Sequence, residues 1–275
     1  MYAREIAPVI RQNEFMTLRA VILDWAGTVA DFGSRAPIAA LQSVFASAGV
    51  PVTVQEARAS MGLAKRDHIR AILEIPRVHE AWIAVHGAAP AEYAVEKLYA
   101  KFIPSQLEVL VNHSCLIPGV ADAVARWRVR GLKIGTTTGY NRAMLDYLLD
   151  RAAQQNFVPD SAICPDDVGE GRPLPWMCYL TAIRLKTYPL SAFVKIGDTP
   201  TDMEEGRNAG LWTIGITRTG NEVGLTEDEW QRLPPAEQDA LLRIAERRLV
   251  DAGAHYTAGS IAECDPIFDR LEAEN

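Results

Sequence analysis

Five polar residues stand at points of the chain where they could bind a phosphoryl group and a metal ion. In chain order they are Asp24, Thr138, Arg172, Asp198 and Asp202. A carboxylate can attack phosphorus or bind a hard cation such as Mg²⁺, whereas a hydroxyl and an always-charged guanidinium suit phosphate oxygens. Each residue alone more often has a structural role, such as capping a turn or facing solvent. Their order along one chain therefore carries more weight than any single residue.

Two apolar runs place carboxylates at the end of predicted strands. The run 20–23 predicts a strand buried on both faces of a parallel sheet, with Asp24 at its carboxyl end. The run 193–196 predicts a second such strand, which ends before Asp198. Ligands of open α/β sheets bind at this edge, so the carboxylates are expected to share one site. Asp202 is expected to hold that site together without ligating a metal directly.

Short apolar runs alternate with helical patterns in residues 18–33 and again from residue 117 onward. The predicted helices are 120–130 and 141–155, and the predicted strands are 132–136, 161–164 and 211–216. This alternation is typical of a parallel sheet with helices on both faces. The sequence therefore predicts an α/β fold with a Rossmann-like, doubly wound core formed by residues 1–36 and 113–275.

The segment between these two regions predicts helices and no strand. Thr53 and Glu56 form a capping-box pattern, and residues 91–111 carry apolar side chains at helical spacing. A helical bundle inserted directly after the strand that carries Asp24 is suited to cover the site. Residues 37–112 are therefore expected to form a helical cap domain.

Two sets of motifs resemble a known family. The first set is Asp24-Trp25-Ala26-Gly27-Thr28, Thr138, Arg172, and Gly197-Asp198 with Asp202. It resembles the four-motif pattern of the haloacid dehalogenase superfamily. The segment 61–68, Met-Gly-Leu-Ala-Lys-Arg-Asp-His, resembles the MGxxKxDH cap motif of the phosphonatase family within that superfamily. The resemblance extends from about Leu18 to the end of the chain.

This resemblance implies a hydrolase that cleaves the C–P bond of phosphonoacetaldehyde to acetaldehyde and phosphate, in 2-aminoethylphosphonate degradation. It implies Mg²⁺ as cofactor, bound by Asp24, the main-chain carbonyl of Ala26, and Asp198. It further implies that Asp24 forms an aspartyl phosphate, that Lys65 forms a Schiff base, and that the caps pair in a homodimer. Implied or possible contacts of the substrate are Thr138, Arg172, Met61 and Tyr140.

The side chain two residues after Asp24 is a methyl group, because position 26 is alanine. Most phosphatases and mutases of the superfamily have an aspartate there, which protonates the departing alcohol and then activates water. Metal binding by the main-chain carbonyl of residue 26 would not be affected, because that oxygen is present whatever the side chain. The chain therefore favours a leaving group that needs no proton on oxygen, such as carbon.

A carbon leaving group needs a place for its electron pair. The amine of Lys65 can condense with an aldehyde to an iminium, which takes up the electrons as an enamine. The amine must be neutral to attack, and a low-dielectric site or nearby cations such as Arg66 would favour that form. His68 shares a helical face with Lys65 and is a candidate for moving protons. The regenerated amine and His68 are both candidates for activating the hydrolytic water.

Three other functions stay open at this point. A phosphate-ester phosphatase or mutase of the same superfamily would use the same residues but would need the acid missing at position 26. A hydrolytic dehalogenase would have no use for the acidic pair Asp198 and Asp202. A non-catalytic metal- or phosphate-binding module would turn over no phosphonate.

Composition agrees with a small-molecule enzyme. The 275 residues are 48% hydrophobic, enough for a large core, and the net charge of −7 argues against nucleic-acid or membrane-surface partners. The four cysteines show no CxxC or metal-ligand spacing, which favours a reduced, cytoplasmic protein. The first residues lack an apolar signal region, so no signal peptide is expected.

Overall fold

A parallel sheet forms the centre of the computed structural model, which describes residues 17–273. Within these residues its strands are β1 (Ala20–Leu23), β2 (Lys133–Thr137), β3 (Ser161–Ile163), β4 (Phe193–Gly197), β5 (Trp212–Ile216) and β6 (Tyr256–Ala258). The strand order is β3-β2-β1-β4-β5-β6, and each neighbouring pair is parallel. The predicted Rossmann-like core is confirmed. The N-terminal residues that we expect to lack a signal peptide lie outside the described residues.

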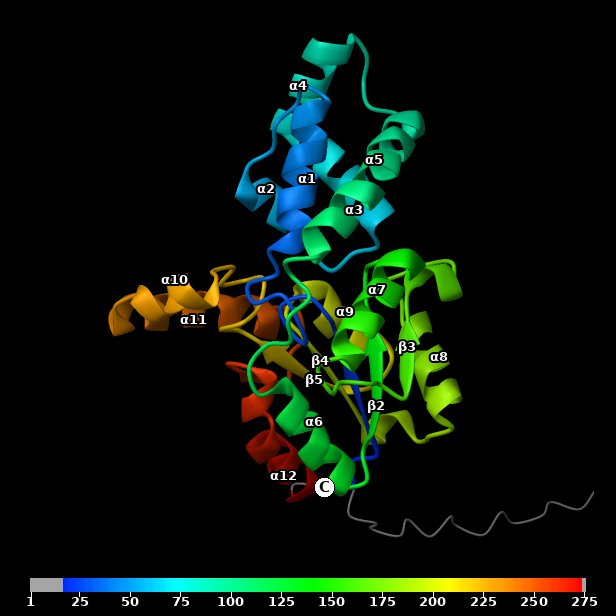
Figure 1. Ribbon diagram of the computed structural model, residues 1–275, viewed down its shortest axis with the longest axis vertical. Coiled ribbons are helices and arrows are strands. Elements are labelled where there is room, and N and C mark those ends of the chain that lie inside the picture. The colour runs from blue at the N-terminus through cyan, green and yellow to red at the C-terminus, as the bar shows by residue number, and fades with distance from the viewer. Residues whose placement is uncertain (1–16, 274–275) are drawn as a thin grey trace, which may run out of the picture.

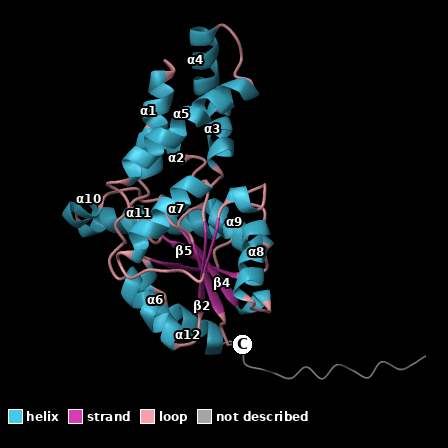
Figure 2. Cartoon of the chain, turned by 45° about the vertical axis from the view of Figure 1, so that its right-hand side comes forward, coloured by secondary structure: helices cyan, strands magenta, loops and turns pink. Residues whose placement is uncertain are grey.

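Helices flank this sheet, as Figure 2 shows. They are α6 (Val120–Val129), α7 (Arg142–Ala153), α8 (Trp176–Leu185), α9 (Pro200–Asn208), α11 (Pro235–Asp251) and α12 (Asp265–Ala273), while α10 (Glu227–Arg232) packs on α11 at the side of the core. The helices expected over 120–130 and 141–155 are α6 and α7. Across the described part of the chain, no helix is both long and apolar enough to cross a membrane.

Strand β1 is buried on both faces, as its apolar run predicts. All four of its side chains are fully buried. Val21 and Leu23 lie in the large core on one side of the sheet, while Ala20 and Ile22 pack with Leu185 of α8 on the other. A strand held from both sides fixes the position of the residue that follows it, Asp24.

Five helices lie between β1 and α6 and form what we call the helical insert (residues 36–110). They are α1 (Ala36–Ser47), α2 (Val54–Arg58), α3 (Lys65–Glu74), α4 (Pro76–His86) and α5 (Glu92–Leu110). The insert stands over one end of the sheet, and α1 packs along α5 (Figure 1). Every residue of the insert is described and none lies in a strand, as predicted. The expected capping box forms, with Thr53 Oγ1 accepting from the Glu56 amide at 3.1 Å.

The two chain segments that join the insert to the core lie side by side. The amide of Asp31 donates to the carbonyl of Cys115, and Asp31 Oδ1 lies 2.7 Å from His113 Nδ1. The other oxygen of Asp31 accepts from the amide of Ala36 at the start of α1, at 2.8 Å. The two chain connections between the insert and the core therefore lie together, and we call them the hinge region (residues 31–35 and 111–116).

Candidate active site

Asp24 and Asp198 meet at the carboxyl edge of the sheet because β1 and β4 are neighbours. Leu23 pairs with Ile196, and the amide of Asp24 donates to the Ile196 carbonyl at 2.9 Å. Thr138 follows β2, the neighbour of β1 on its other side. The residues that the sequence placed at three strand ends thus surround one point, and Ala26 lines the same cavity.

Three buried carboxylates form a group that could hold a metal ion. Asp24, Asp198 and Asp202 each have an oxygen within 4.8 Å of the others. Asp198 Oδ2 accepts from the Asn221 amide at 2.7 Å, but its Oδ1 is buried without a hydrogen-bond donor among the described residues. Burial raises the pKa of Asp198 well above its usual value, and the neighbouring Asp24 and Asp202 raise it further. A hard divalent cation would relieve both costs.

Asp202 differs from the other two carboxylates because cations already contact it. Its Oδ1 lies 3.0 Å from Arg172 Nη2 and 3.0 Å from Lys195 Nζ, although neither contact has hydrogen-bond geometry. Its Oδ2 accepts from the amide and hydroxyl of Thr199. Burial alone would raise the pKa of Asp202, but Arg172 and Lys195 outweigh it and lower the pKa. This environment suits a residue that orients its neighbours.

Arg172 points at Asp24 from the loop before α8. Its Nη2 donates to Asp24 Oδ1 at 2.7 Å and to the Thr137 carbonyl at 2.9 Å, and its side chain is almost fully buried. Burial and Asp202 raise the pKa of Asp24, whereas Arg172 and Lys195 act in the opposite direction. An ionised Asp24 therefore depends on the cations placed beside it.

Lys195 and Glu205 complete the buried charge network, and neither is among the predicted site residues. Lys195 Nζ lies 2.9 Å from Glu205 Oε2, which also accepts from Arg172 Nε at 2.9 Å. Both side chains are fully buried. A lysine within the apolar run of a central strand needs a buried partner, so Lys195 was a signal available in the sequence. Among the described residues, Arg172 and Lys195 contact Asp24, Asp202 and Glu205 but not Asp198, so a divalent ion would supply the cation that Asp198 lacks.

Lys65 reaches the same cavity from the helical insert. It begins α3, and its Nζ lies 3.9 Å from Met61 Sδ and 5.2 Å from the centre of the Tyr140 ring. Among the described residues no carboxylate lies within 4.0 Å of this amine. Burial lowers the pKa of Lys65 to about 8; Arg172 lowers it too, while Asp24 opposes the change.

The expected contribution of Arg66 to this low pKa is not found. Arg66 is exposed, its Nε pairs with Glu96 at 2.7 Å, and its guanidinium lies over the ring of Tyr99. A solvated and neutralised guanidinium has little effect on Lys65. The cation that acts on the amine is Arg172, which is distant in sequence and close in space.

His68 is fully buried on α3 and does not line the cavity. Its Nε2 lies 2.8 Å from the Ala57 carbonyl, which assigns the ring proton to Nε2, while Nδ1 has no hydrogen-bond partner among the described residues. Burial and the nearby Lys65 lower the pKa of His68 to about 3, so its ring is neutral. It thus adds no positive charge beside the amine.

The cavity is small because the insert lies directly on the core. Asp24, Lys65, Arg172 and Asp198 line it, with walls formed by Met61, Thr138, Tyr140 and Ser34 among others. Its volume is about 20 Å³, room for about one water molecule. A second cavity of about 200 Å³ lies beside it and shares Lys65 and Tyr140. The closed cavity is too small for a phosphonate, so we expect the insert to move when a substrate enters.

Two glycines permit this close contact. A Cβ at Gly62 of the insert would lie 2.1 Å from Thr201 Oγ1, and one at Gly139 of the core would lie 2.3 Å from the Leu63 carbonyl. Thr201 Oγ1 donates to the Met61 carbonyl at 3.2 Å across the same boundary. The structure therefore has the insert closed over the carboxylates.

Comparisons with known proteins agree with this geometry. A family model described as haloacid dehalogenase-like hydrolase matches residues 18–210. The chain is 42% identical over 259 residues to a phosphonoacetaldehyde hydrolase of Bacillus cereus, covering 94% of this chain and 98% of that protein. It is 45% identical over 256 residues to the protein of that name from Nitratidesulfovibrio vulgaris, covering 93% and 91%.

A solved structure is also similar over nearly the whole chain. It is a phosphonoacetaldehyde hydrolase-like protein from Oleispira antarctica, with a TM-score of 0.93 and 38% sequence identity. The alignment covers 97% of each chain, so it includes the helical insert as well as the sheet.

Proposed function

The chain belongs to the haloacid dehalogenase-like hydrolases, and we propose that it hydrolyses the C–P bond of phosphonoacetaldehyde to acetaldehyde and phosphate. One observation carries the proposal: the buried amine of Lys65 lines the same cavity as Asp24, while position 26 offers no acid. The names of the relatives that share nearly the full length of the chain support the same substrate.

Lys65 is proposed to form a Schiff base with the aldehyde. Its lowered pKa leaves a sizeable neutral fraction near neutral pH, and neutral amine is the form that adds to a carbonyl. Loss of water then gives an iminium, whose nitrogen can accept the electron pair of the C–P bond. The second cavity beside Lys65 gives the aldehyde end of the substrate a side from which to approach.

Asp24 is proposed to attack phosphorus. A carboxylate oxygen forms the new O–P bond while the C–P bond breaks, and the electron pair moves into the C=C bond of an enamine. Thr138 and Arg172, which line the cavity, are proposed to hold the phosphonate oxygens in this step. Water then cleaves the aspartyl phosphate to phosphate, and the enamine takes up a proton at carbon and is hydrolysed to acetaldehyde.

The metal is proposed to be Mg²⁺, held by the carboxylates of Asp24 and Asp198 and the main-chain carbonyl of Ala26. When bound, this cation would neutralise charge on the phosphonate oxygens. The unpartnered oxygen of Asp198 and the group of three buried carboxylates support the assignment. Asp202 is proposed to orient Arg172 and Lys195 rather than to ligate, since both cations already contact it.

The remaining predicted residues are given supporting roles in this proposal. Met61 and Tyr140, which lie beside the amine, are proposed to contact the substrate. His68 is proposed to take part in proton movement through Nδ1, its atom without a partner. Residues 37–112 are proposed to act as the cap domain over a core formed by residues 1–36 and 113–275, and the closed insert supports this division.

The test of the function compares two substrate classes. With Mg²⁺ and phosphonoacetaldehyde, the purified protein is expected to release phosphate and acetaldehyde in equal amounts, measured by separate assays. Hydrolysis of a phosphate ester is expected to be at least about a hundredfold slower, because no acid at position 26 protonates its leaving oxygen. Chelation of the metal should stop release, and added Mg²⁺ should restore it. A faster reaction with the ester would favour the phosphatase alternative.

The reaction is expected to depend on pH through Lys65. Because the amine reacts only when neutral and its pKa is about 8, kcat/KM should rise about tenfold per pH unit below pH 8 and level off above it. Labelling of Lys65 by acetaldehyde and cyanoborohydride, followed by mass spectrometry, should show the same dependence on pH. Acetaldehyde has no phosphonate group, so ionisation of the substrate does not contribute to this profile. A labelling midpoint above pH 10 would contradict the lowered pKa.

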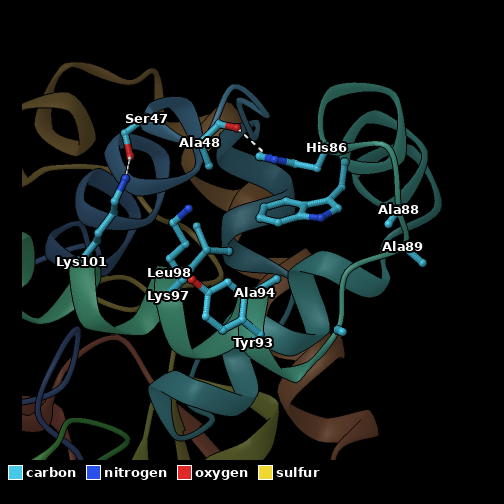
Figure 3. A pocket seen from close by; sticks show the side chains of 12 residues that line it. Ser47, Ala48, His86, Ala88, Ala89, Tyr93, Ala94, Lys97, Leu98 and Lys101 are labelled. Carbon is cyan, nitrogen blue, oxygen red and sulfur yellow. Dashed lines mark hydrogen bonds between the residues drawn. The ribbon is translucent and has the colours of Figure 1, made fainter.

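The protein is further proposed to work as a homodimer through the helical insert. An apolar cavity of about 360 Å³ opens on the insert beside the strongly exposed Tyr93, and Figure 3 shows Tyr93, Ala94 and Leu98 gathered around it. Exposed apolar surface of this kind is typical of interfaces. Sedimentation should give twice the chain mass of 30.2 kDa, and Tyr93→Glu should lower it; a monomeric wild-type protein would contradict the proposal.

We further propose that the protein acts in the cytoplasm on a small phosphonate from 2-aminoethylphosphonate degradation, with neither nucleic acid nor membrane as partner. The lack of CxxC or metal-ligand spacing among its four cysteines supports a compartment where thiols stay reduced. Immunodetection after cell fractionation would test the location.

A further inference from the structure

Arg58, the last residue of α2, crosses from the helical insert to the core. Its Nη1 donates to the Gly33 carbonyl at 3.0 Å, and to the carbonyl and Oδ1 of Asn221 at 3.1 and 2.9 Å. Its Nη2 donates to the Gly224 carbonyl at 2.9 Å. All acceptors lie outside the insert, in the hinge region or in the loop between β5 and α10, which we call the β5–α10 loop (residues 217–226).

The β5–α10 loop also contacts Asp198, which follows β4. The amide of Asn221 donates to Asp198 Oδ2 at 2.7 Å, so one residue contacts both Arg58 and the proposed metal carboxylate. The loop fits closely here, since a Cβ at Gly220 would lie 2.6 Å from Asp198 Cβ. Thr219 Oγ1 also donates to the carbonyl of Gly27, beside the strand end that carries Asp24, at 2.8 Å.

The core leaves space for the guanidinium of Arg58. Gly224 has a φ of +69°, and a Cβ there would lie only 2.6 Å from Arg58 Cζ. A residue with a side chain would be strained in this conformation and would displace the guanidinium. The glycine therefore provides independent support for a specific contact at this position.

Opening of the insert must disturb these hydrogen bonds. Arg58 belongs to the moving insert, whereas Asn221 and Gly224 belong to the core. The cavity of about 20 Å³ is too small for a substrate, so the insert has to open and close during turnover. Each closure would then return the guanidinium to Asn221 and fix the loop that orients Asp198.

We propose that Arg58 is a positioning residue that couples closure of the insert to the arrangement of Asp198 for the metal. This inference rests on the proposed function, in which Asp198 binds a cation and the insert closes over a phosphonate. Because coupling between two sites is reciprocal, closure around a phosphoryl ligand strengthens cation binding, and the bound cation favours closure.

The test measures Mg²⁺ affinity by titration calorimetry, with and without inorganic phosphate as the ligand that closes the insert. In the wild-type protein phosphate is expected to tighten Mg²⁺ binding. In Arg58→Ala this tightening should be about tenfold smaller, within the usual range of coupling between sites. Gly224→Ala changes the core side of the same contact and should reduce the tightening equally. Arg58→Lys keeps the positive charge but loses the second nitrogen donor of the guanidinium, so its tightening should lie between those of the wild-type protein and Arg58→Ala.

Arg77→Ala is the matched control. Arg77 is another arginine of the insert, but its partners, Glu56 and the Pro51 carbonyl, lie within the insert. It should retain the wild-type effect of phosphate. Equal tightening in Arg58→Ala and wild-type protein would overturn the inference, as would a loss of Mg²⁺ affinity that is the same with and without phosphate. A failure of the proposed function would appear instead in the wild-type protein, as absence of phosphonoacetaldehyde turnover.

Discussion

Replacing Lys65 by arginine is expected to lower phosphate release from phosphonoacetaldehyde by at least about a thousandfold. Arginine keeps a positive charge of similar reach, but its guanidinium does not lose its proton and forms no Schiff base. Without the iminium, the electron pair of the C–P bond has no acceptor. Phosphate release is measured directly, and borohydride treatment with the substrate should yield a reduced adduct on Lys65 only in the wild-type protein.

The matched control for this variant is Lys186→Arg. Lys186 is an exposed lysine that lines neither the cavity at Asp24 nor the cavity proposed for the dimer contact, so its replacement should leave both phosphate release and the adduct on Lys65 unchanged. Circular dichroism should show that Lys65→Arg is folded. Full activity of the folded Lys65→Arg protein would refute the Schiff-base mechanism and leave the phosphoryl site to be explained by another reaction.

Replacing Asp24 by asparagine is expected to stop attack on phosphorus but not Schiff-base formation at Lys65. Asparagine can still accept the hydrogen bond from Arg172, but its amide is a poor nucleophile toward phosphorus. Phosphate release should fall by at least about a thousandfold, whereas the borohydride adduct on Lys65 should still form. Mass spectrometry of the reduced protein measures the adduct, and a phosphate assay on the same sample measures the loss.

The two variants together make opposite predictions for the adduct. Lys65→Arg should lose adduct and phosphate release, while Asp24→Asn should lose only phosphate release. If Asp24→Asn released phosphate at the wild-type rate, water or another residue would have to attack phosphorus. If it lost the adduct as well, carbon–nitrogen bond formation would depend on Asp24, and the order of steps proposed above would be wrong.

Most of the sheet could be predicted from the sequence because its patterns are local. The edge strand β6 was not predicted, since its three half-buried residues form no apolar run. Apolar runs such as 20–23 and 193–196 marked strands, and the helical spacing of residues 91–111 marked α5. Parallel neighbours end at one edge, so the approach of Asp24 and Asp198 followed from the strand assignment alone.

Electrostatic partners were harder to predict, because they depend on distance in space. Arg66 is next to Lys65 in sequence, yet the cation that lowers the pKa of the amine is Arg172. Lys195 and Glu205 lie in different elements, β4 and α9, and only the packed sheet brings them together. His68 shares the helix of Lys65 as predicted, but helical spacing does not tell which residues form the cavity wall.

The absence of a side chain at Gly62 and Gly139 affects the pKa of Lys65. A larger residue at either position would hold the helical insert away from the core, and water molecules could then enter between them. Lys65 owes its low pKa first to burial, so a hydrated seam would return the amine toward its ordinary, protonated form. Gly62 and Gly139 therefore help to keep the pKa of the Lys65 amine low without needing to contact that amine.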